Sequence, residues 1–199
     1  MSATKVLLSA EELNLVQDTH WLLTKNNIIE KAKEMFGELA SSLRVEIGNR
    51  DHLPESVRLF SPKISKGEYY QGLPYVMLDY PRVFTRDEVF AMRTMFWWGN
   101  FFSVTLQLKG SYQILYGPVL LQKWELLAAK GFYVSVSEDE WDHDFTPGNY
   151  EIVSSRETIE KAMRGHFLKL AVRIPVREWN DALKLIGEHQ RTIMDLLAD

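Results

Sequence analysis

A regular alternation of apolar and polar residues in the middle of the chain constrains its fold more than any other feature of the sequence. From residue 102 to residue 109, apolar side chains occupy every second position and polar ones lie between them. This period of two is typical of a β-strand that buries one face. The large apolar residues of 168–174 repeat the alternation. Strands with one polar face predict an antiparallel or mixed sheet whose other face is covered by helices.

The strand at 102–109 is expected to be one half of a β-hairpin. Gly99 and Asn100 separate it from a second strand-like segment at 90–98. Glycine at the first central position suits a two-residue type II′ turn. With that turn, Arg93 lies opposite Leu106 on the apolar face, and a shift of one residue would exchange the two faces. The other face then carries aromatic, hydroxyl and amide side chains, namely Phe96, Trp98, Ser103, Thr105 and Gln107.

The N-terminal region is predicted to be a helical pair. Ser9 and Glu12 form a capping-box pattern that opens a helix over 10–24. A second helical stripe of apolar residues begins after Asn26-Asn27. The short connection favours an antiparallel arrangement of these two helices.

The whole chain, 1–199, is expected to form a single α+β domain. Its 199 residues are close to the usual size of one domain, and they contain neither an internal repeat nor a linker. We predict helices mainly on one face of a sheet that contains the Gly99-Asn100 hairpin. The expected regions are an N-terminal helical pair at about 10–50, an aromatic-rich strand region at about 60–110 and an α/β remainder at 111–199 with a C-terminal helix after Pro175.

Composition excludes several classes of function. The chain has no cysteine, which excludes disulfides, thiolate metal sites and cysteine nucleophiles. With 23 basic and 27 acidic residues, its net charge of −4 argues against nucleic acid as a partner. No segment approaches the roughly 20 apolar residues of a membrane span, and Met1–Ala10 lacks the apolar stretch of a signal peptide. We therefore expect a cytoplasmic protein with no membrane partner.

Motifs of known chemistry are incomplete in this sequence. Gly67 and Gly72 have the spacing of a P-loop, but the Lys-Ser/Thr pair that should follow is replaced by Leu-Pro. His143 between Asp142 and Asp144 is a secondary candidate for a metal site, and a solvated acidic loop is the alternative. No nucleophile lies beside a base, so no reaction can be named and enzymatic activity stays open. We expect no cofactor.

The aromatic residues are concentrated in one segment. Residues 60–102 hold 12 of the 24 aromatic residues, and residues 61–110, with six basic and four acidic residues, are net positive. An arginine on a buried face needs a charged, hydrogen-bonded partner. Asp79 in the neighbouring strand is the first candidate for Arg93, and Glu68 is the second. Such a pair either fixes the strand register or anchors a ligand.

Binding of a small molecule, with an acidic ligand favoured, is the leading functional prediction. The alternative is a structural or interaction module in which the surface around Trp97 and Trp98 is a homodimer or partner interface. Binding of single-stranded nucleic acid is a third reading, which the net charge disfavours. The candidate ligand-binding residues are Lys63, Lys66, Glu68, Asp79, Arg82, Arg93, Phe96, Trp98, Ser103, Thr105 and Gln107.

Overall fold

The structure is a computed structural model that describes residues 6–198. The chain alternates between helical and extended segments along its length. The helices are α1 (Ala10–Gln17), α2 (Thr19–Gly48), α3 (Glu55–Arg58), α4 (Ser111–Gln122), α5 (Trp124–Ala129), α6 (Arg156–Met163), the 3₁₀ helix η2 (Val176–Asp181) and α7 (Ala182–Leu196). The strands are β1 (Lys63–Tyr70), β2 (Leu73–Phe84), β3 (Val89–Trp97), β4 (Phe101–Lys109), β5 (Tyr133–Ser135), β6 (Tyr150–Ile152) and β7 (Phe167–Pro175).

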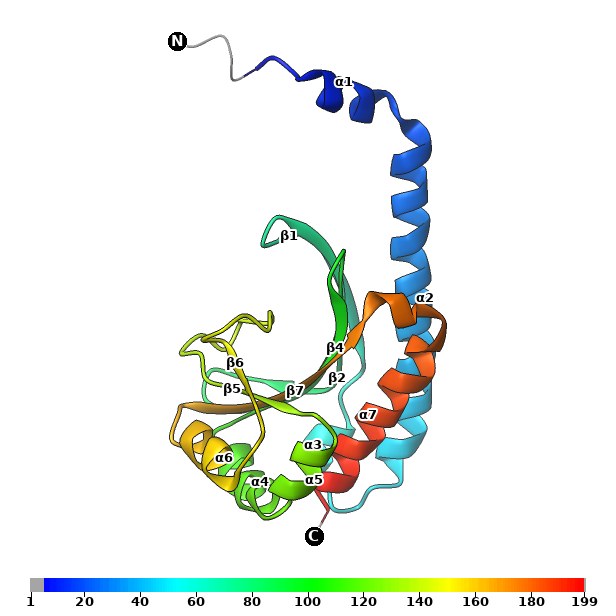
Figure 1. Cartoon of the computed structure of the whole chain (residues 1–199). Coiled ribbons are helices and arrows are strands. Elements are labelled where there is room, and N and C mark those ends of the chain that lie inside the picture. The colour runs from blue at the N-terminus through cyan, green and yellow to red at the C-terminus, as the bar shows by residue number, and fades with distance from the viewer. Residues whose placement is uncertain (1–5, 199) are drawn as a thin grey trace.

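The predicted α+β architecture is confirmed. The described strands form one seven-stranded sheet in the order β1-β2-β3-β4-β7-β5-β6, and every neighbouring pair is antiparallel. The sheet is strongly curved (Figure 1). Helices α2 and α7 cover one side, here called the helix face, and the segment 136–149 crosses the other side, here called the concave face.

The hydrophobic core lies between the sheet and the two long helices. Apolar side chains of α2 recur at helical spacing from Ile29 to Ile47 and are at most 5% exposed. They meet the alternating apolar side chains of β3, β4 and β7, such as Phe102 and Leu170, in one cluster. The predicted C-terminal helix packs on the same face, where Ile186 is fully buried.

The N-terminal helices differ from the expected antiparallel pair. The break falls at Asp18, whose side chain accepts a hydrogen bond from the backbone N–H of Trp21 at 2.9 Å and so begins α2. Helix α2 then continues through Asn26 and Asn27. Asparagine has neither the ring of proline nor the backbone freedom of glycine, the two features that most disfavour a helix interior. Helix α1 buries no residue and does not pack antiparallel to α2 (Figure 1).

The β3–β4 hairpin is present, but its register differs from the prediction by one residue. Its loop contains three residues, Trp98, Gly99 and Asn100, so Trp97 pairs with Phe101. Gly99 has a φ of 73°, the left-handed conformation that a three-residue loop requires and glycine adopts readily. The shift exchanges the partners of β3: Arg93 lies opposite Thr105 rather than Leu106. The side chains of β3 were therefore assigned to the wrong faces, whereas the predicted apolar face of β4 is confirmed by the burial of Phe102, Val104, Leu106 and Leu108 in the core.

Proline residues lie inside strand β2 and helix α4. Strand β2 continues beyond Pro81, because the pairing with β3 is irregular between Asp79 and Arg82 and tolerates the missing N–H. Helix α4 contains Pro118 in its interior. No helix among residues 6–198 has the length and apolar composition needed to cross a membrane.

Candidate functional site

The concave face carries buried polar side chains from four adjacent strands. Asp79 of β2 pairs with Arg93 of β3, which pairs with Thr105 of β4. Gln107 of β4 lies opposite Lys169 of β7. All five residues are at most 7% exposed. They are buried because residues 136–149, here called the covering loop, fold over this part of the sheet (Figure 1).

The ion pair predicted between Arg93 and Asp79 is present. The guanidinium donates two hydrogen bonds to the carboxylate, from Nε to Oδ1 at 2.6 Å and from Nη2 to Oδ2 at 3.2 Å. Two aromatic rings flank the guanidinium, with centroids 5.7 Å away for Phe84 and 5.5 Å away for Trp141. This paired and stacked arrangement is one in which an arginine can be buried.

His143 of the covering loop lies between two basic side chains. Its Nε2 is 3.0 Å from Nη1 of Arg93, and its Nδ1 is 3.3 Å from Nζ of Lys169. Burial, and then the neighbouring basic groups of Lys169 and Arg93, hold the pKa of His143 well below its usual 6.5, so the ring is neutral. Arginine can only donate, which makes Nε2 the acceptor and places the ring proton on Nδ1.

The tautomer of His143 determines the protonation state of Lys169. Its Nζ lies 2.9 Å from the carbonyl oxygen of Glu140 and 2.5 Å from that of Asp142, and both can only accept. A neutral amine has two N–H groups for these carbonyls and one lone pair for the Nδ1–H of His143. Burial, with a contribution from Arg93, lowers the pKa of Lys169 to about 7, in agreement with this bonding pattern. We conclude that Lys169 becomes largely uncharged as the pH rises above 7.

The far end of the covering loop is attached to the sheet by Tyr70 and Asp144. The Tyr70 hydroxyl accepts hydrogen bonds from the backbone N–H groups of His143, at 2.7 Å, and Asp144, at 3.2 Å. Asp144 Oδ2 accepts from the side chains of Gln71, at 2.6 Å, and Asn149, at 3.0 Å. Burial alone would raise the pKa of Asp144, but hydrogen bonds from Thr146, Gln71 and Asn149 outweigh it and lower the pKa.

The three residues of the secondary metal candidate, Asp142, His143 and Asp144, all form hydrogen bonds with other protein groups. His143 has a basic group at each ring nitrogen, and the Asp144 carboxylate accepts hydrogen bonds from neighbouring side chains. The Asp142 side chain accepts from the hydroxyl of Ser137 at 2.6 Å. Within residues 6–198, no group of three or more histidine and acidic side chains is arranged to hold a metal ion.

A cavity of about 400 Å³ adjoins the Arg93–Asp79 pair and is here called the Arg93 cavity. Two further basic residues line it, Lys63 and Arg82, and the described part of the chain gives neither a salt bridge. Arg82 donates from Nε to the carbonyl oxygen of Ser61 at 3.1 Å, which leaves its terminal nitrogens for another acceptor. The remaining lining residues are Ser65, Met77, Asp79, Phe84, Thr85, Val89, Arg93, Glu140 and Trp141.

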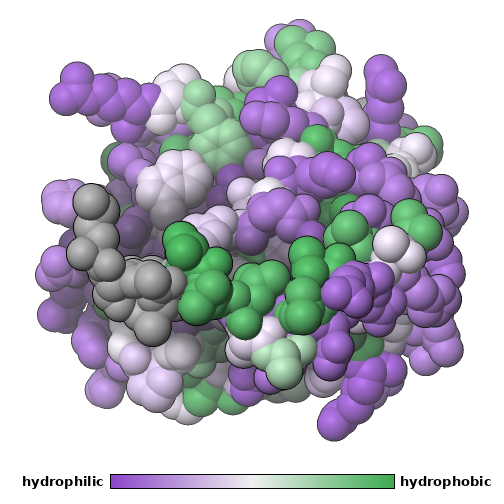
Figure 2. All heavy atoms as spheres, turned by 90° about the horizontal axis from the view of Figure 1, so that it is seen from above, coloured by the Kyte–Doolittle hydropathy of each residue, from purple (hydrophilic) through white to green (hydrophobic). Residues whose placement is uncertain are grey.

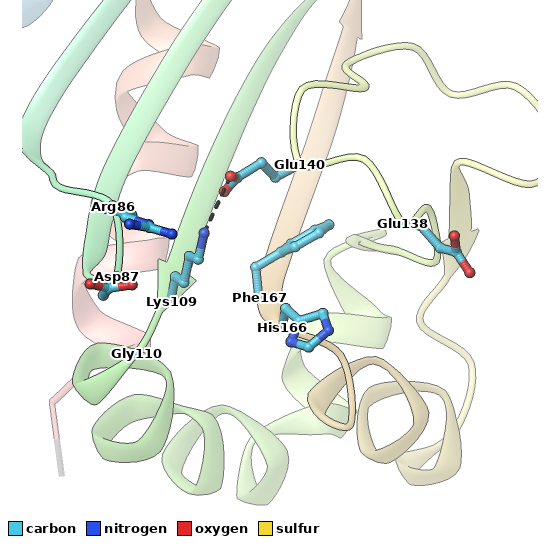
Figure 3. Close-up of a pocket in the computed structure, with 8 residues that line it drawn as sticks. All are labelled: Arg86, Asp87, Lys109, Gly110, Glu138, Glu140, His166 and Phe167. Atoms are coloured by element: carbon cyan, nitrogen blue, oxygen red, sulfur yellow. Dashed lines mark hydrogen bonds and ion pairs between the residues drawn. The ribbon is translucent and has the colours of Figure 1, made fainter.

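Glu140 lines both the Arg93 cavity and a second hollow of about 540 Å³. Its carboxylate accepts from Gln107 at 2.8 Å and forms an ion pair with Lys109 at 3.4 Å. In Figure 3, Glu140 and Lys109 point toward one another above Phe167, and the Arg86 side chain extends toward Lys109. The covering loop therefore places its own carboxylate beside Lys109 in the lining of this hollow.

The predicted site residues divide between the two faces of the sheet. The concave face brings together Lys63, Asp79, Arg82 and Arg93 around the Arg93 cavity. The expected surface of aromatic and hydroxyl side chains does not exist as one face, because the hairpin register differs. Ser103, Thr105 and Gln107 are buried on the concave face, whereas Phe96, Trp98, Lys66 and Glu68 belong to the helix side, where Glu68 forms a salt bridge with Lys25 of α2.

Sequence reasoning did not identify Lys169, Tyr70, Glu140 or Trp141 as parts of this site. Lys169 occupies a polar position in an alternating strand, where solvent exposure is the ordinary expectation. Its burial depends on where the covering loop lies, and no local pattern carries that information. Only the density of acidic residues in the loop, opposite a net positive segment, pointed toward a contact of this kind.

Comparisons of the chain with protein-family models, with curated proteins and with solved structures find no significant match.

Proposed function

We propose that the protein binds a small anionic molecule in the Arg93 cavity. The observation that carries the proposal is the presence of two basic side chains, Lys63 and Arg82, beside a cavity in which the acidic groups are already paired. Asp79 is bound to Arg93, and Glu140 is bound to Gln107 and Lys109. An anion in the cavity would supply a charged partner for Lys63 and for the terminal nitrogens of Arg82.

The composition of the cavity favours a carboxylate or phosphate attached to an apolar group. Its volume of about 400 Å³ falls in the usual range for small-molecule sites. Phe84 and Trp141 stack on one another, with centroids 6.4 Å apart, and offer a flat apolar wall. The terminal nitrogens of Arg82 can donate to two oxygens of one anion, which is the stronger mode of anion recognition.

The test uses aromatic acids and their neutral counterparts as probes. Benzoate, indole-3-acetate and phenyl phosphate are titrated by calorimetry, with benzamide as the uncharged control. We expect binding of at least one anion and none of benzamide. Lys63→Met and Arg82→Met should each weaken binding about tenfold or more, since a hydrogen bond to a charged group contributes roughly 1.5–3 kcal/mol.

Lys66→Met is the matched control for Lys63→Met. Both lysines are exposed and belong to β1, but they point to opposite faces of the sheet. Affinity in Lys66→Met should equal that of the unmodified protein. Equal weakening by the two substitutions would contradict the site and indicate non-specific attraction, and failure of all three anions to bind would contradict the ligand class.

The alternative of an aromatic interface is supported at Trp98 alone. Trp97 is 6% exposed and packs against Tyr70 and Phe101 on the concave side. Trp98 instead lines an apolar hollow with Trp179 on the helix side of the sheet. Because the two sites lie on opposite faces, a partner at Trp98 and a ligand in the Arg93 cavity can bind independently.

A further inference from the structure

The N-terminal arm, defined here as residues 6–24, exposes an unusual amount of apolar surface. It comprises an extended segment, α1 and the first turns of α2, and it projects from the body of the molecule (Figure 1). Seen from above, apolar side chains form a band across the molecule (Figure 2). Nine large apolar side chains of the arm are between 47% and 83% exposed, namely Val6, Leu7, Leu8, Leu13, Leu15, Val16, Trp21, Leu22 and Leu23.

The size of this surface indicates a protein partner. Burying a whole aliphatic side chain removes on the order of 100 Å² of apolar surface from water, so nine half-exposed side chains offer roughly 500 Å². An exposed apolar surface of several hundred Å² is often a functional surface in soluble proteins. Within residues 6–24 the charged side chains are acidic, Glu11, Glu12 and Asp18, and an anionic membrane would repel them.

The helix side of the sheet offers a hollow that matches the arm. It has a volume of about 470 Å³ and lies among α2, the β3–β4 loop and η2. Lys31 stands at its edge, and the described residues give this lysine no salt bridge. The arm and the hollow are therefore complementary in hydrophobicity, since both are apolar, and in charge, since the arm is acidic and the edge of the hollow is basic. The lining residues are Ile28, Lys31, Phe96, Trp98, Gly99, Val176 and Trp179.

The arm cannot reach the hollow of its own chain. Helix α2 is continuous from Thr19 to Gly48, so it holds the arm away from Lys31. Thr19, the first residue of α2, lies 12 positions before Lys31, which corresponds to roughly 18 Å along the helix axis, and α1 lies beyond Thr19. A second copy related by a two-fold axis removes this restriction, because each chain carries both the arm and the hollow.

We propose that two copies of this chain form a symmetric dimer in which the arm of each lies in the hollow of the other. Two arms, together with the surfaces on which they lie, would bury on the order of 2,000 Å², which is the size of a stable interface. Such a dimer would use the surface at Trp98 as its interface, and it does not depend on a ligand in the Arg93 cavity.

The oligomeric state tests the proposal directly. Sedimentation velocity on the full chain between 1 and 100 µM, roughly the range of moderately stable dimers, should show a dimer. Val16→Glu combined with Leu23→Glu should raise the dissociation constant at least about a hundredfold, since four buried contacts are lost in a two-fold dimer. Both side chains are more than 60% exposed, so the fold should tolerate the charges.

Val45→Glu is the matched control. Val45 is 68% exposed on α2 and Val16 is 69% exposed on α1, so the two substitutions differ mainly in position. The control should leave the dimer intact. A monomer throughout the concentration range would overturn the proposal, and so would equal weakening by Val45→Glu. Binding of the monomer to phosphatidylserine vesicles would assign the arm to a membrane instead.

Disulfide trapping tests the position of the arm. The chain has no cysteine, so introduced thiols are the only ones present. A disulfide requires Cα atoms within about 7 Å, which a single chain cannot achieve between positions 16 and 31. Mixing Val16→Cys with Lys31→Cys under mild oxidation should give a covalent heterodimer much faster than mixing Val16→Cys with Val45→Cys. Equal rates would place the arm elsewhere and overturn the arrangement.

Discussion

Replacing Lys169 by methionine should remove a specific pH dependence from the stability of the fold. The hydrogen bonds around Lys169 fit a neutral amine, and burial lowers its pKa to about 7. In the unfolded chain the pKa returns to the usual 10.5. Between these two values the unfolded state binds a proton that the folded state does not, so the free energy of unfolding rises with pH.

The magnitude follows from the two pKa values. Each pH unit in this window contributes about 1.4 kcal/mol, so the full effect from pH 7 to pH 10.5 is on the order of 5 kcal/mol. Between pH 8.0 and pH 9.5 the rise due to Lys169 should be about 2 kcal/mol. Because Lys169 is fully buried, solvent should screen this effect little.

Urea unfolding, followed by tryptophan fluorescence at several pH values, measures the effect. Other groups titrate in the same range, so the quantity of interest is the difference in slope between the unmodified protein and Lys169→Met. Parallel pH profiles would refute the reasoning and show that Lys169 stays protonated in the fold. Should Lys169→Met fail to fold, ¹⁵N spectra of His143 decide the point, because a neutral Lys169 requires the proton on Nδ1.

Further expected results concern the same face and the hairpin. Asp79→Asn and Arg93→Leu should each destabilise the fold by about 3–5 kcal/mol in urea unfolding, and the double variant by clearly less than the sum; additive losses would mean that the buried pair does not interact. Tyr70→Phe should cost about 1–3 kcal/mol and make the covering loop easier to cleave by protease, because two backbone N–H groups lose their acceptor. Gly99→Ala should destabilise by about 1 kcal/mol because of its positive φ, whereas Gly37→Ala within α2 should stabilise by about 0.5–1 kcal/mol; thermal unfolding that moved in the same direction for both would contradict this.

The sequence predicted those parts of the fold that periodicity controls. The alternation of 102–109 and 168–174 identified β4 and β7, and the stripe from Ile28 to Ile47 identified the core face of α2. The hairpin was predicted but not its register, since a two-residue turn and a three-residue loop around Gly99 both fit the sequence. That one-residue difference moved Phe96 and Trp98 away from Ser103, Thr105 and Gln107.

The Arg93–Asp79 pair was predicted in spite of the wrong register. Burying an unpaired guanidinium is costly in either register, and the pairing of β2 with β3 does not depend on the turn at Gly99. Lys169 and Arg173 show a feature that the strand pattern could not predict, namely which polar side chain is buried. Both occupy the polar side of β7, yet Lys169 is fully buried and Arg173 is exposed. The covering loop causes this difference, and its position depends on long-range contacts such as those of Tyr70.

The covering loop and the proposed ligand should stabilise one another. Glu140 and Trp141 belong to the loop and also line the Arg93 cavity, so a molecule bound there contacts the loop in its observed position. Any ligand that binds this arrangement more tightly than one with the loop displaced must reduce the displaced population by the same factor. The contacts of His143 with Arg93 and Lys169 hold the loop in place without a ligand. An anion at Lys63 and Arg82 would add to these contacts, and protease cleavage of the loop should slow as the ligand concentration rises.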